Sequence, residues 1–328
     1  MRTRTVNGTT VSLTEIGFGA AVIGNLYYET SDQDAEEAVE AAWHAGIRYF
    51  DTAPHYGLGL SERRLGRALK GLPRAEFVVS SKVGRLLVPN PQPADRDREG
   101  FAVPDELHRE RDYSGDGVLR SIDATLARTG LDRLDVVYVH DPDDHWQQAV
   151  KEAIPTLADL RSQGVLQAIG VGMNQSAMLA RFLRETLVDV VMLAGRYTLL
   201  EQDALDDVLA AAAALGKSVV AVGVFNSGIL AQPRPGPGAK YNYEDAAPEV
   251  IARANKIADV CVQHRTSLPA AAIAFPLAHP CVVNVTLGMR SAAEVQRNVD
   301  LYNSGVPPRL WPDLRAAGLL RPDAPTPV

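Results

Sequence analysis

Short, nearly continuous apolar runs alternate along this chain with longer segments whose apolar residues recur at helical spacing. The apolar runs are Ile16–Gly19, Tyr49–Asp51, Phe77–Lys82, Val136–His140, Ala168–Val171, Val190–Leu193, Ser218–Val222 and Val282–Thr286. Several are unbroken Val/Ile/Leu stretches, which is typical of parallel strands buried on both faces. The helical patterns are Asp32–Ala45, Ser61–Leu69, Gly117–Thr129, Gln148–Gln163, Ser176–Thr186, Asp203–Leu215, Pro248–His264 and Ser291–Tyr302. This alternation predicts an α/β fold.

The number of strand–helix units favours a closed (β/α)8 TIM barrel over an open, doubly wound sheet. An open dinucleotide-binding sheet would carry G-x-G-x-x-G after its first strand, whereas Val22 stands at the third glycine position after Gly17-Phe-Gly19. Asn7-Gly8 between two β-forming segments predicts an N-terminal β-hairpin within residues 1–14. We therefore expect one domain over 1–328, with a loosely held, proline-containing tail at 321–328.

Two connections, residues 83–115 and 223–247, are much longer than the others. Both are polar and rich in proline, and both follow the carboxyl end of a predicted strand. Because barrel enzymes build their active sites at that rim, these stretches are expected to be long rim loops that act as lids or binding loops.

Composition narrows the class of protein. The 328 residues are 46% hydrophobic and carry a net charge of −7, which argues against a nucleic-acid partner. No run reaches the roughly 18 apolar residues of a membrane span, and the first residues lack the apolar core of a signal peptide. Two cysteines favour a reducing, cytoplasmic location. We expect an enzyme or a small-molecule binder, present as a monomer or a small homo-oligomer.

Four polar residues of different types lie at or just after successive strand ends. Asp51, Lys82 and His140 end the second, third and fourth predicted strands, and Tyr56 lies in the loop after Asp51. Barrel geometry brings such positions to one rim. A desolvated Lys82 needs a carboxylate such as Asp51, and a cation beside the phenol would lower the pKa of Tyr56 toward that of a general acid or base. The alternative is a structural Asp–Lys pair with a packed histidine, but four such residues together favour a catalytic site.

The segment Asp51-Thr-Ala-Pro-His-Tyr56-Gly, followed by Ser61-Glu-x-x-Leu-Gly66 and completed by Lys82 and His140, resembles the signature of the aldo-keto reductase superfamily. The resemblance covers nearly the whole chain. It implies a (β/α)8 barrel, an NAD(P) cofactor bound across the rim, and no metal. It makes Tyr56 the acid/base, Lys82 its pKa modulator, Asp51 the partner of Lys82, and His140 the donor that orients the substrate.

Further segments are similar to bacterial L-fucose and D-threo-aldose 1-dehydrogenases, with pyridoxal 4-dehydrogenase and L-galactose dehydrogenase as relatives. These segments are Gly17-Phe-Gly-Ala-Ala, Asp112-Tyr-Ser-x-Asp-Gly, Val139-His-Asp-Pro-Asp, Ala194-Gly-Arg-Tyr-Thr-Leu-Leu-Glu-Gln and Val224-Phe-Asn-Ser-Gly-Ile-Leu. This similarity implies NAD(P)-dependent oxidation of the anomeric carbon of a cyclic aldose, such as L-fucose or D-arabinose, to a lactone. The alternatives are oxidation of pyridoxal, general aldehyde reduction, and a non-catalytic cofactor-binding barrel subunit.

The cofactor positions follow from the same resemblance. Many relatives have a glutamine and a nicotinamide-stacking aromatic where this chain has Ala194 and Val222, so Tyr197 or Phe225 is a candidate substitute, with simple packing as the alternative. Met173 and Asn174 match the carboxamide-binding position. The pyrophosphate loop corresponds to Asn226, Ser227, Gly228, Ile229 and Leu230, whose small residues suit phosphate approach.

The adenosine end of the cofactor corresponds to Gly288, Arg290, Glu294 and Asn298, at the start of the last predicted helix. An acid at Glu294 would repel a 2′-phosphate and accept ribose hydroxyls, which predicts NAD. Arg290 argues for NADP as the alternative, because a guanidinium binds phosphate well.

A metal site is not expected, because His140-Asp-Pro-Asp-Asp-His145 matches no standard zinc or calcium spacing. We expect His55, Tyr113, Asp141 and Trp146 to line a polar sugar pocket, with loop packing as the alternative for each.

Overall fold

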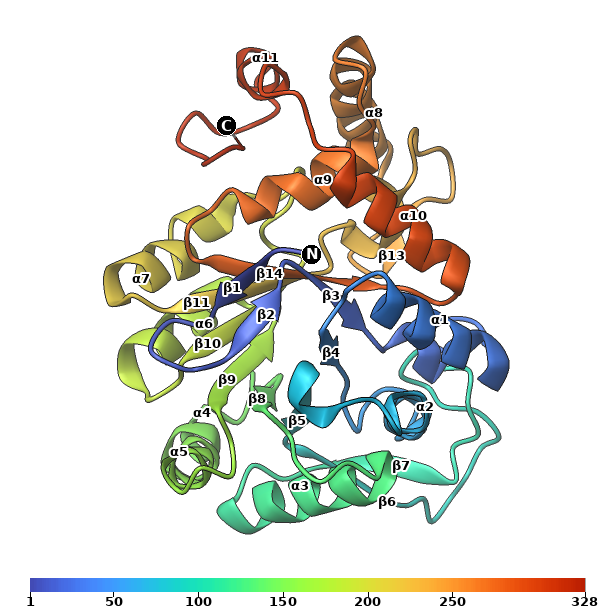
Figure 1. Ribbon diagram of the computed structural model, residues 1–328, viewed down its shortest axis with the longest axis vertical. Helices are drawn as coiled ribbons and strands as arrows, with labels where there is room; N and C mark the ends of the chain where they lie inside the picture. The colour runs from blue at the N-terminus through green and yellow to red at the C-terminus, as the bar shows by residue number, and fades with distance from the viewer. Residues whose placement is uncertain (328) are drawn as a thin grey trace.

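Eight parallel strands form a closed ring in the computed structural model, which describes residues 1–327 (Figure 1). In chain order, which is also their order around the ring, they are β3 (Ile16–Gly19), β4 (Tyr49–Asp51), β5 (Val78–Val83), β8 (Val136–His140), β9 (Ala168–Met173), β10 (Val190–Ala194), β11 (Ser218–Val222) and β14 (Val282–Gly288). The ring closes where β14 pairs in parallel with β3, with Val285 opposite Ile16. The predicted barrel and its eight strands are confirmed.

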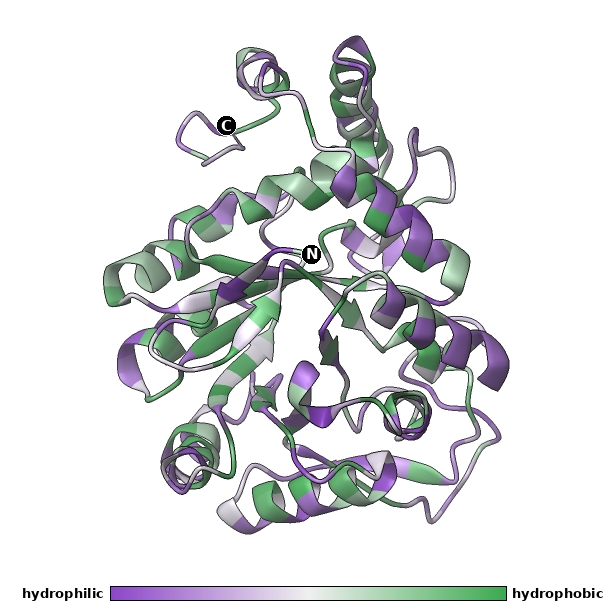
Figure 2. Ribbon diagram, viewed as in Figure 1, coloured by the Kyte–Doolittle hydropathy of each residue, from purple (hydrophilic) through white to green (hydrophobic). Residues whose placement is uncertain are grey.

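Helices surround the ring and turn their apolar faces toward it (Figures 1 and 2). Those that match a prediction are α1 (Asp32–His44), α2 (Leu60–Leu69), α3 (Gly115–Thr129), α6 (Ser176–Glu185), α7 (Val208–Leu215), α8 (Pro248–Gln263) and α10 (Ala292–Asn303). The hydroxyls of Ser31, Ser114 and Ser291 accept backbone N–H hydrogen bonds at the first turns of α1, α3 and α10. No helix in the described part of the chain is both long and apolar enough to cross a membrane.

Two predicted helices are broken up. The segment predicted over Gln148–Gln163 consists of α4 (Trp146–Gln148), a π-helical turn (Ala149–Ala153) and α5 (Ile154–Ser162). Pro155, in the first turn of α5, has no N–H to donate to the preceding turn, which accounts for the change in hydrogen-bond register there. The segment predicted over Asp203–Leu215 begins with a separate 3-10 turn (Asp203–Leu205) before α7.

Two helices have no counterpart in the predicted pattern. Helix α9 (Leu268–Leu277) is apolar all round, and nearly all of its residues are buried against β14 and the neighbouring helices. It therefore shows no alternation of apolar and polar faces. Helix α11 (Leu310–Ala316) is short and buries Leu310, Trp311 and Leu314.

The long rim loops contain their own small sheets. In the stretch 83–115, β6 (Arg85–Pro89) pairs antiparallel with β7 (Leu107–Arg111). In the stretch 223–247, β12 (Lys240–Tyr241) pairs with β13 (Glu244–Asp245). Both loops stand at the carboxyl end of the barrel, as expected.

The predicted N-terminal hairpin is present as β1 (Thr3–Thr5) and β2 (Ser12–Thr14), and it closes the opposite end of the barrel. Val6, Val11 and Leu13 pack into an apolar cluster with strand residues such as Tyr49 and Tyr138. Because that end of the barrel is filled, the barrel interior opens at its carboxyl rim, where a pocket lies.

The tail differs from the expectation. Arg321 pairs with Asp206 at 2.5 Å, and the carbonyl oxygen of buried Ala324 accepts a 2.7 Å hydrogen bond from Arg315. Residues 321–327 are thus anchored to the helical layer rather than loosely held, because burial and ion pairing outweigh the proline content. Val328 lies outside the described residues.

Candidate active site

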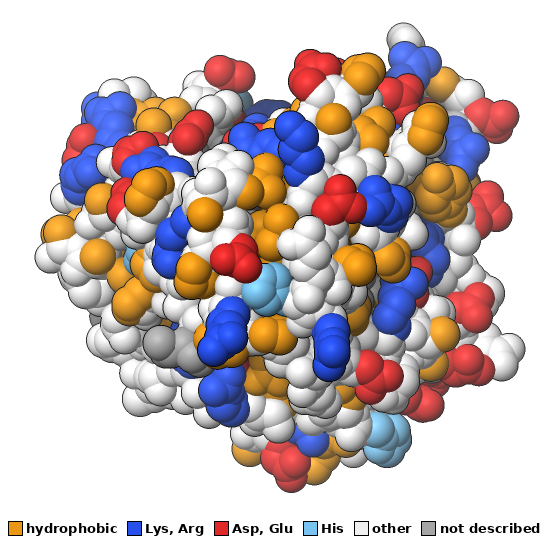
Figure 3. All heavy atoms as spheres, turned by 90° about the horizontal axis from the view of Figure 1, so that it is seen from above, with side chains coloured by type: hydrophobic (Ala, Val, Ile, Leu, Met, Phe, Trp, Pro, Cys, Tyr) orange, Lys and Arg blue, Asp and Glu red, His pale blue; other side chains and the backbone are white. Residues whose placement is uncertain are grey.

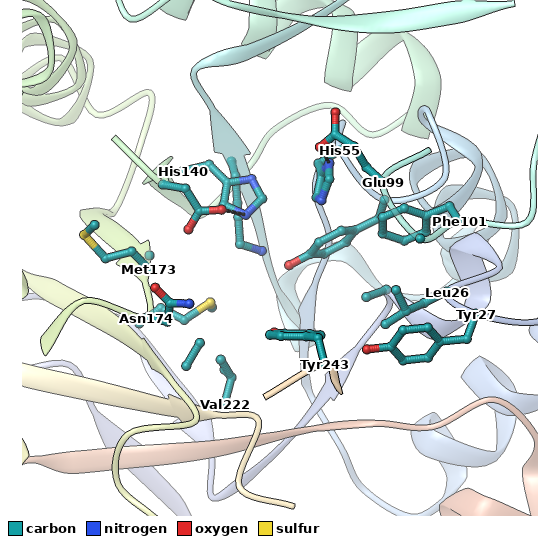
Figure 4. Close-up of a pocket in the computed structure, with 18 residues that line it drawn as sticks. Leu26, Tyr27, His55, Glu99, Phe101, His140, Met173, Asn174, Val222 and Tyr243 are labelled. Carbon is teal, nitrogen blue, oxygen red and sulfur yellow. Dashed lines mark ion pairs between the residues drawn. The ribbon is translucent and has the colours of Figure 1, made fainter. Parts of the chain in front are cut away.

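A pocket of about 520 Å³ opens at the carboxyl end of the barrel (Figure 4). Its floor and walls come from strand ends and from the loops near residues 21–27, 55–56, 99–101 and 243. The lining residues are Ala21, Leu26, Tyr27, His55, Tyr56, Lys82, Glu99, Gly100, Phe101, His140, Asp141, Gly172, Met173, Asn174, Met192, Ala194, Val222 and Tyr243. On the face seen in Figure 3, acidic and basic side chains are mixed and no single sign dominates.

Lys82 and Asp51 form the buried base of the site. The Nζ of Lys82 donates hydrogen bonds to Oδ2 of Asp51 at 2.7 Å and to the carbonyl oxygen of Thr52 at 3.0 Å. The hydroxyl of Ser80 donates to the other oxygen of Asp51 at 2.7 Å. The Nζ of Lys82 also lies 4.6 Å from the ring centroid of Tyr56. The predicted convergence of these residues is therefore present.

The ionisation of this group differs in one respect from the expectation. Burial by itself would lower the pKa of Lys82, but the Asp51 carboxylate and the Tyr56 phenol together raise it, so the ammonium form persists. Burial raises the pKa of Tyr56 to about 12, and Lys82 only partly offsets that rise. The expected lowering of the Tyr56 pKa is thus not the net result in the protein alone. Tyr56 rests as a neutral phenol.

Two neutral imidazoles stand beside Tyr56. The ring centroids of His55 and His140 lie 5.9 and 6.0 Å from that of Tyr56, and 5.6 Å from each other. Burial, helped by Arg85, lowers the pKa of His55 to about 2 and that of His140 well below its ordinary value. A neutral imidazole such as that of His140 can donate a hydrogen bond without adding charge to the site.

The loop that carries Tyr56 has little freedom. Gly57 has φ +62°, and a Cβ there would come within 2.1 Å of the carbonyl oxygen of Gly24. On the other side, Arg109 donates a 2.8 Å hydrogen bond to the carbonyl oxygen of His55. These contacts hold the phenol at the pocket.

The predicted nicotinamide positions divide into two groups. Met173 and Asn174, at the end of β9, line the pocket beside Ala194 and Val222. Tyr197 does not line the pocket. Its ring is buried against that of Phe275, at a centroid distance of 4.9 Å, so it is a packing residue.

Phe225 also lies outside the pocket, packed against the core at the start of the following turn. The aromatic side chain that stands beside Val222 is instead Tyr243, from the tip of the β12–β13 hairpin (Figure 4). No periodicity marks that loop residue, so sequence reasoning missed it.

The predicted pyrophosphate loop is a tight turn after β11. Asn226, Ser227 and Gly228 have consecutive positive φ values of 44°, 60° and 104°. Asn226 donates from Nδ2 to the carbonyl oxygen of Gly195 at 3.1 Å, while its buried Oδ1 has no partner among the described residues. The hydroxyl of Ser227 accepts a 2.9 Å hydrogen bond from the backbone N–H of Tyr243. Small side chains suit the close approach of a phosphate here, whereas the unpaired Oδ1 of Asn226 matches only a donor such as a ribose hydroxyl. Leu230 is wholly buried.

The other predicted cofactor residues gather where β14 meets α10. Arg290 donates to the carbonyl oxygens of Leu26 at 2.8 Å and Tyr28 at 3.0 Å, and to Oγ1 of Thr30 at 2.7 Å. Its guanidinium therefore ties a rim loop down. Glu294 accepts the backbone N–H of Arg290 at 2.8 Å.

Gly288 is exposed at the end of β14, and Asn298 is buried in α10. A Cβ at Gly288 would come within 3.2 Å of a Val22 methyl carbon. Of the three residues Gly288, Glu294 and Asn298, Gly288 is exposed, Glu294 is partly exposed and Asn298 is buried.

The predicted substrate residues are also divided. His55 and Asp141 line the pocket. Tyr113 is fully buried, and its hydroxyl donates to the carbonyl oxygens of His140 at 2.6 Å and Asp141 at 2.9 Å, so it supports the backbone instead. Trp146 packs on Phe182 at a centroid distance of 4.4 Å, away from the pocket.

The loops contribute lining residues that the sequence did not reveal, namely Leu26, Tyr27, Glu99, Phe101 and Tyr243. Their side chains enter the pocket through contacts between distant loops, such as the hydrogen bond from the Tyr27 N–H to the Gly100 carbonyl oxygen at 2.8 Å. Within residues 1–327 there is no cluster of three or more histidine, cysteine or acidic side chains arranged to hold a metal ion.

A closed parallel barrel with a buried Lys–Asp pair beside a tyrosine and a neutral histidine defines an oxidoreductase site. The model of the aldo/keto reductase family matches residues 15–316. The chain belongs to the aldo-keto reductase family, whose members use NAD(P) cofactors, and it is an enzyme.

Characterised relatives span nearly the whole chain. D-threo-aldose 1-dehydrogenase of Pseudomonas sp is 46% identical over 314 residues, covering 94% of this chain and 95% of its own. Pyridoxal 4-dehydrogenase of Microbacterium luteolum is 37% identical, with 97% of each chain covered. L-Galactose dehydrogenase of Arabidopsis thaliana is 28% identical, covering 90% of this chain and 86% of its own.

Among solved structures, the glycerol dehydrogenase of Gluconobacter oxydans superposes with a TM-score of 0.77 at 22% identity, covering 99% of this chain and 97% of its own. That similarity establishes the fold.

Proposed function

We propose that this enzyme is an aldose 1-dehydrogenase that oxidises the anomeric carbon of a cyclic aldose, such as L-fucose or D-arabinose, to a lactone. The observation that carries the proposal is the Asp51–Lys82–Tyr56 group with neutral His140 at one pocket, in a chain 46% identical to a D-threo-aldose 1-dehydrogenase. Pyridoxal oxidation is the second candidate, because the pyridoxal 4-dehydrogenase relative is 37% identical over almost the full chain.

The residues divide the chemistry between them. His140 donates a hydrogen bond to the reacting oxygen, and Tyr56 removes the proton of the anomeric hydroxyl. Lys82, held by Asp51, stabilises the phenolate that Tyr56 must become. A bound NAD, held by Met173, Asn174 and the turn at 226–230, would supply the acceptor for the hydride that leaves the same carbon.

The cofactor is proposed to lie along Met173 and Asn174, the turn at 226–230, and the start of α10. The tight turn at Asn226, Ser227 and Gly228 supports this placement because its small side chains leave room for a phosphate, and Gly288 supports it with its exposed backbone. We assign NAD as the preferred form, because Glu294 brings a carboxylate to the adenosine end and the Arg290 guanidinium is already committed to Leu26, Tyr28 and Thr30.

We also propose that the enzyme is cytoplasmic, because its two cysteines are free and buried and form no disulfide. We propose that it acts on small molecules as a monomer or a small homo-oligomer. Size-exclusion chromatography with light scattering measures the oligomeric state.

The deciding experiment is a panel of L-fucose, D-arabinose, L-galactose and pyridoxal, each with NAD and with NADP, followed by absorbance of the reduced nicotinamide. We expect oxidation of at least one aldose with NAD at a higher kcat/KM than pyridoxal. Turnover of pyridoxal alone, or reduction of aldehydes without aldose oxidation, would overturn the proposal.

A further inference from the structure

Two carboxylates on the pocket wall share one arginine. Arg85, whose side chain is 8% exposed, reaches Oδ2 of Asp141 with one terminal nitrogen at 2.5 Å and Oε2 of Glu99 with the other at 3.6 Å. Both acids line the pocket. Asp141 lies 3.6 Å from His140, and Glu99 stands next to His55 (Figure 4). One buried guanidinium therefore sets the position of two acceptor groups at the site.

The Glu99 carboxylate is held in place by its neighbours, but its oxygens remain available for hydrogen bonds. Besides Arg85, its carboxylate lies 3.5 Å from Arg109 and 3.7 Å from Nδ1 of His55, and its side chain is 49% exposed. None of these contacts is a short hydrogen bond. Arg109 is itself anchored by Asp97 at 2.5 Å, with both side chains at most 5% exposed. The oxygens of Glu99 are thus kept at the pocket by surrounding cations and left open to a ligand.

Asp141 is held in an unusual backbone conformation. Its φ is +42°, a region that non-glycine residues seldom adopt. Three hydrogen bonds maintain it: its N–H donates to the Gly172 carbonyl oxygen at 3.0 Å, and the Tyr113 hydroxyl donates to the carbonyl oxygens of Asp141 and His140. The result is a carboxylate oxygen 3.6 Å from Nε2 of His140. An acceptor therefore sits directly beside the donor to the reacting oxygen.

The charges of this wall balance. The three arginines Arg85, Arg109 and Arg111 are matched by Asp97, Glu99 and Asp141, with Arg111 donating a 3.4 Å hydrogen bond to the carbonyl oxygen of Asp141. A wall without excess positive charge offers no advantage to an anionic ligand. Its free carboxylate oxygens accept hydrogen bonds and donate none, so they match hydroxyl groups.

We propose that Asp141 and Glu99, set by Arg85, are the specificity-determining pair for the substrate's hydroxyl groups. Asp141 accepts from the hydroxyl next to the reacting carbon, and Glu99 accepts from a hydroxyl farther along the ring. This pair selects a neutral polyhydroxylated ring over pyridoxal and over simple aldehydes. The inference rests on the proposed aldose 1-dehydrogenase function.

The test compares Glu99→Gln and Asp141→Asn with the wild type on D-arabinose and on 2-deoxy-D-ribose, which differ only in the C2 hydroxyl. The matched control is Glu106→Gln, an exposed acid of the same loop that lies outside the pocket. We expect each pocket variant to lower kcat/KM for D-arabinose about tenfold, mainly through KM, because a hydrogen bond to a charged group is lost. Asp141→Asn is expected to cost less than twofold on 2-deoxy-D-ribose, and the control less than twofold on either sugar.

Two further readings separate the possible failures. NADH affinity, measured by fluorescence titration, is expected to be unchanged in both variants, so a loss there would point to general damage and overturn the specificity role. If the wild type oxidises no aldose, the proposed function itself is wrong. If it oxidises D-arabinose but Glu99→Gln leaves KM within twofold, the inference is wrong. Glu99→Gln decides the matter even where Asp141→Asn folds poorly, because Glu99 makes no short hydrogen bond in the protein.

Discussion

The ammonium group of Lys82 and the carboxylate of Asp51 are joined by a 2.7 Å hydrogen bond with side chains only 2% and 5% exposed. Asp51 ends β4 opposite Ser80 of β5, so Lys82, two residues farther along β5, projects to the same side. The register of two neighbouring strands therefore places a buried cation beside Tyr56. Several predictions about chemistry and stability depend on this pair and on the groups around it.

Tyr56→Phe tests the acid/base assignment. The substitution removes the only hydroxyl of that ring and keeps its packing, so we expect turnover to fall by about 10² to 10⁴-fold while the melting temperature and NADH binding stay close to wild type. Steady-state kinetics, thermal unfolding and fluorescence titration measure the three quantities. Turnover that survives unchanged would refute the role given to Tyr56.

Asp51→Asn tests the buried pair. Removing the carboxylate leaves Lys82 charged and uncompensated, and we expect a loss of about 3–5 kcal/mol in the free energy of unfolding. The double variant Asp51→Asn/Lys82→Met carries no buried charge at this place, so its stability is expected to recover while its activity does not. Denaturant unfolding of the three proteins measures this; a single variant as stable as wild type would contradict the prediction.

The raised pKa of Tyr56 predicts the pH dependence of the reaction. Oxidation needs the phenolate, which is the minor form below a pKa of about 12. We expect log kcat/KM for oxidation to rise with pH through the neutral and alkaline range, reaching its plateau below pH 12 because bound oxidised nicotinamide favours the phenolate. Aldehyde reduction needs the phenol, which is the major form below that pKa, so its kcat/KM is expected to stay level through the neutral range and to fall only as pH approaches the pKa. A flat oxidation profile from pH 6 to 10 would exclude Tyr56 as the titrating base.

His55 predicts how stability responds to acid. Its pKa is lowered to about 2 in the folded protein, so below the unfolded value near 6.5 the unfolded chain binds a proton that the folded protein does not. Stability is therefore lost as pH falls below 6.5, by about 1.4 kcal/mol per pH unit from this residue.

The measurement is the free energy of unfolding of wild type and His55→Gln between pH 7 and pH 5. We expect the variant to lose about 2 kcal/mol less than wild type over that range. Equal losses in the two proteins would show that His55 is protonated in the folded state.

Glu294→Gln tests the cofactor preference. Removing the negative charge at the start of α10 is expected to improve kcat/KM for NADP about tenfold, since only NADP carries a 2′-phosphate, and to lower that for NAD, whose ribose hydroxyls lose a charged acceptor. Arg290→Ala is the companion variant: because its guanidinium holds Leu26, Tyr28 and Thr30, we expect equal losses with both cofactors. A loss confined to NADP would mean that Arg290 binds the 2′-phosphate.

Local pattern was sufficient for most of the barrel. Strand runs such as Val136–His140 are recognisable because both of their faces are buried, and amphipathic helices such as α1 because only one face is. Helix α9 was not predicted, because a helix buried on all sides has no polar face and its sequence therefore shows no helical period.

Sequence alone was enough to place the proposed catalytic residues, because the ends of parallel strands in a barrel must share one rim. Asp51, Lys82 and His140 needed only their strand positions to be brought together. What each polar group does there was decided by the tertiary structure. Burial raised the pKa of Tyr56, and no local sequence pattern indicates how deeply a side chain is buried. Tyr197 packs against Phe275 instead of lining the pocket, a contact between residues far apart in sequence.

The residues that form the walls of the pocket could likewise not be predicted from the sequence. Glu99 and Tyr243 come from long loops with no repeating pattern, and they reach the site only because Arg85, Arg109 and Ser227 fix those loops to the rim. Strand and helix positions follow from contacts that recur at short, regular spacing along the chain. Pocket walls, ionisation and the commitment of a side chain to one partner depend on contacts between residues far apart in sequence, which only the folded chain brings within reach.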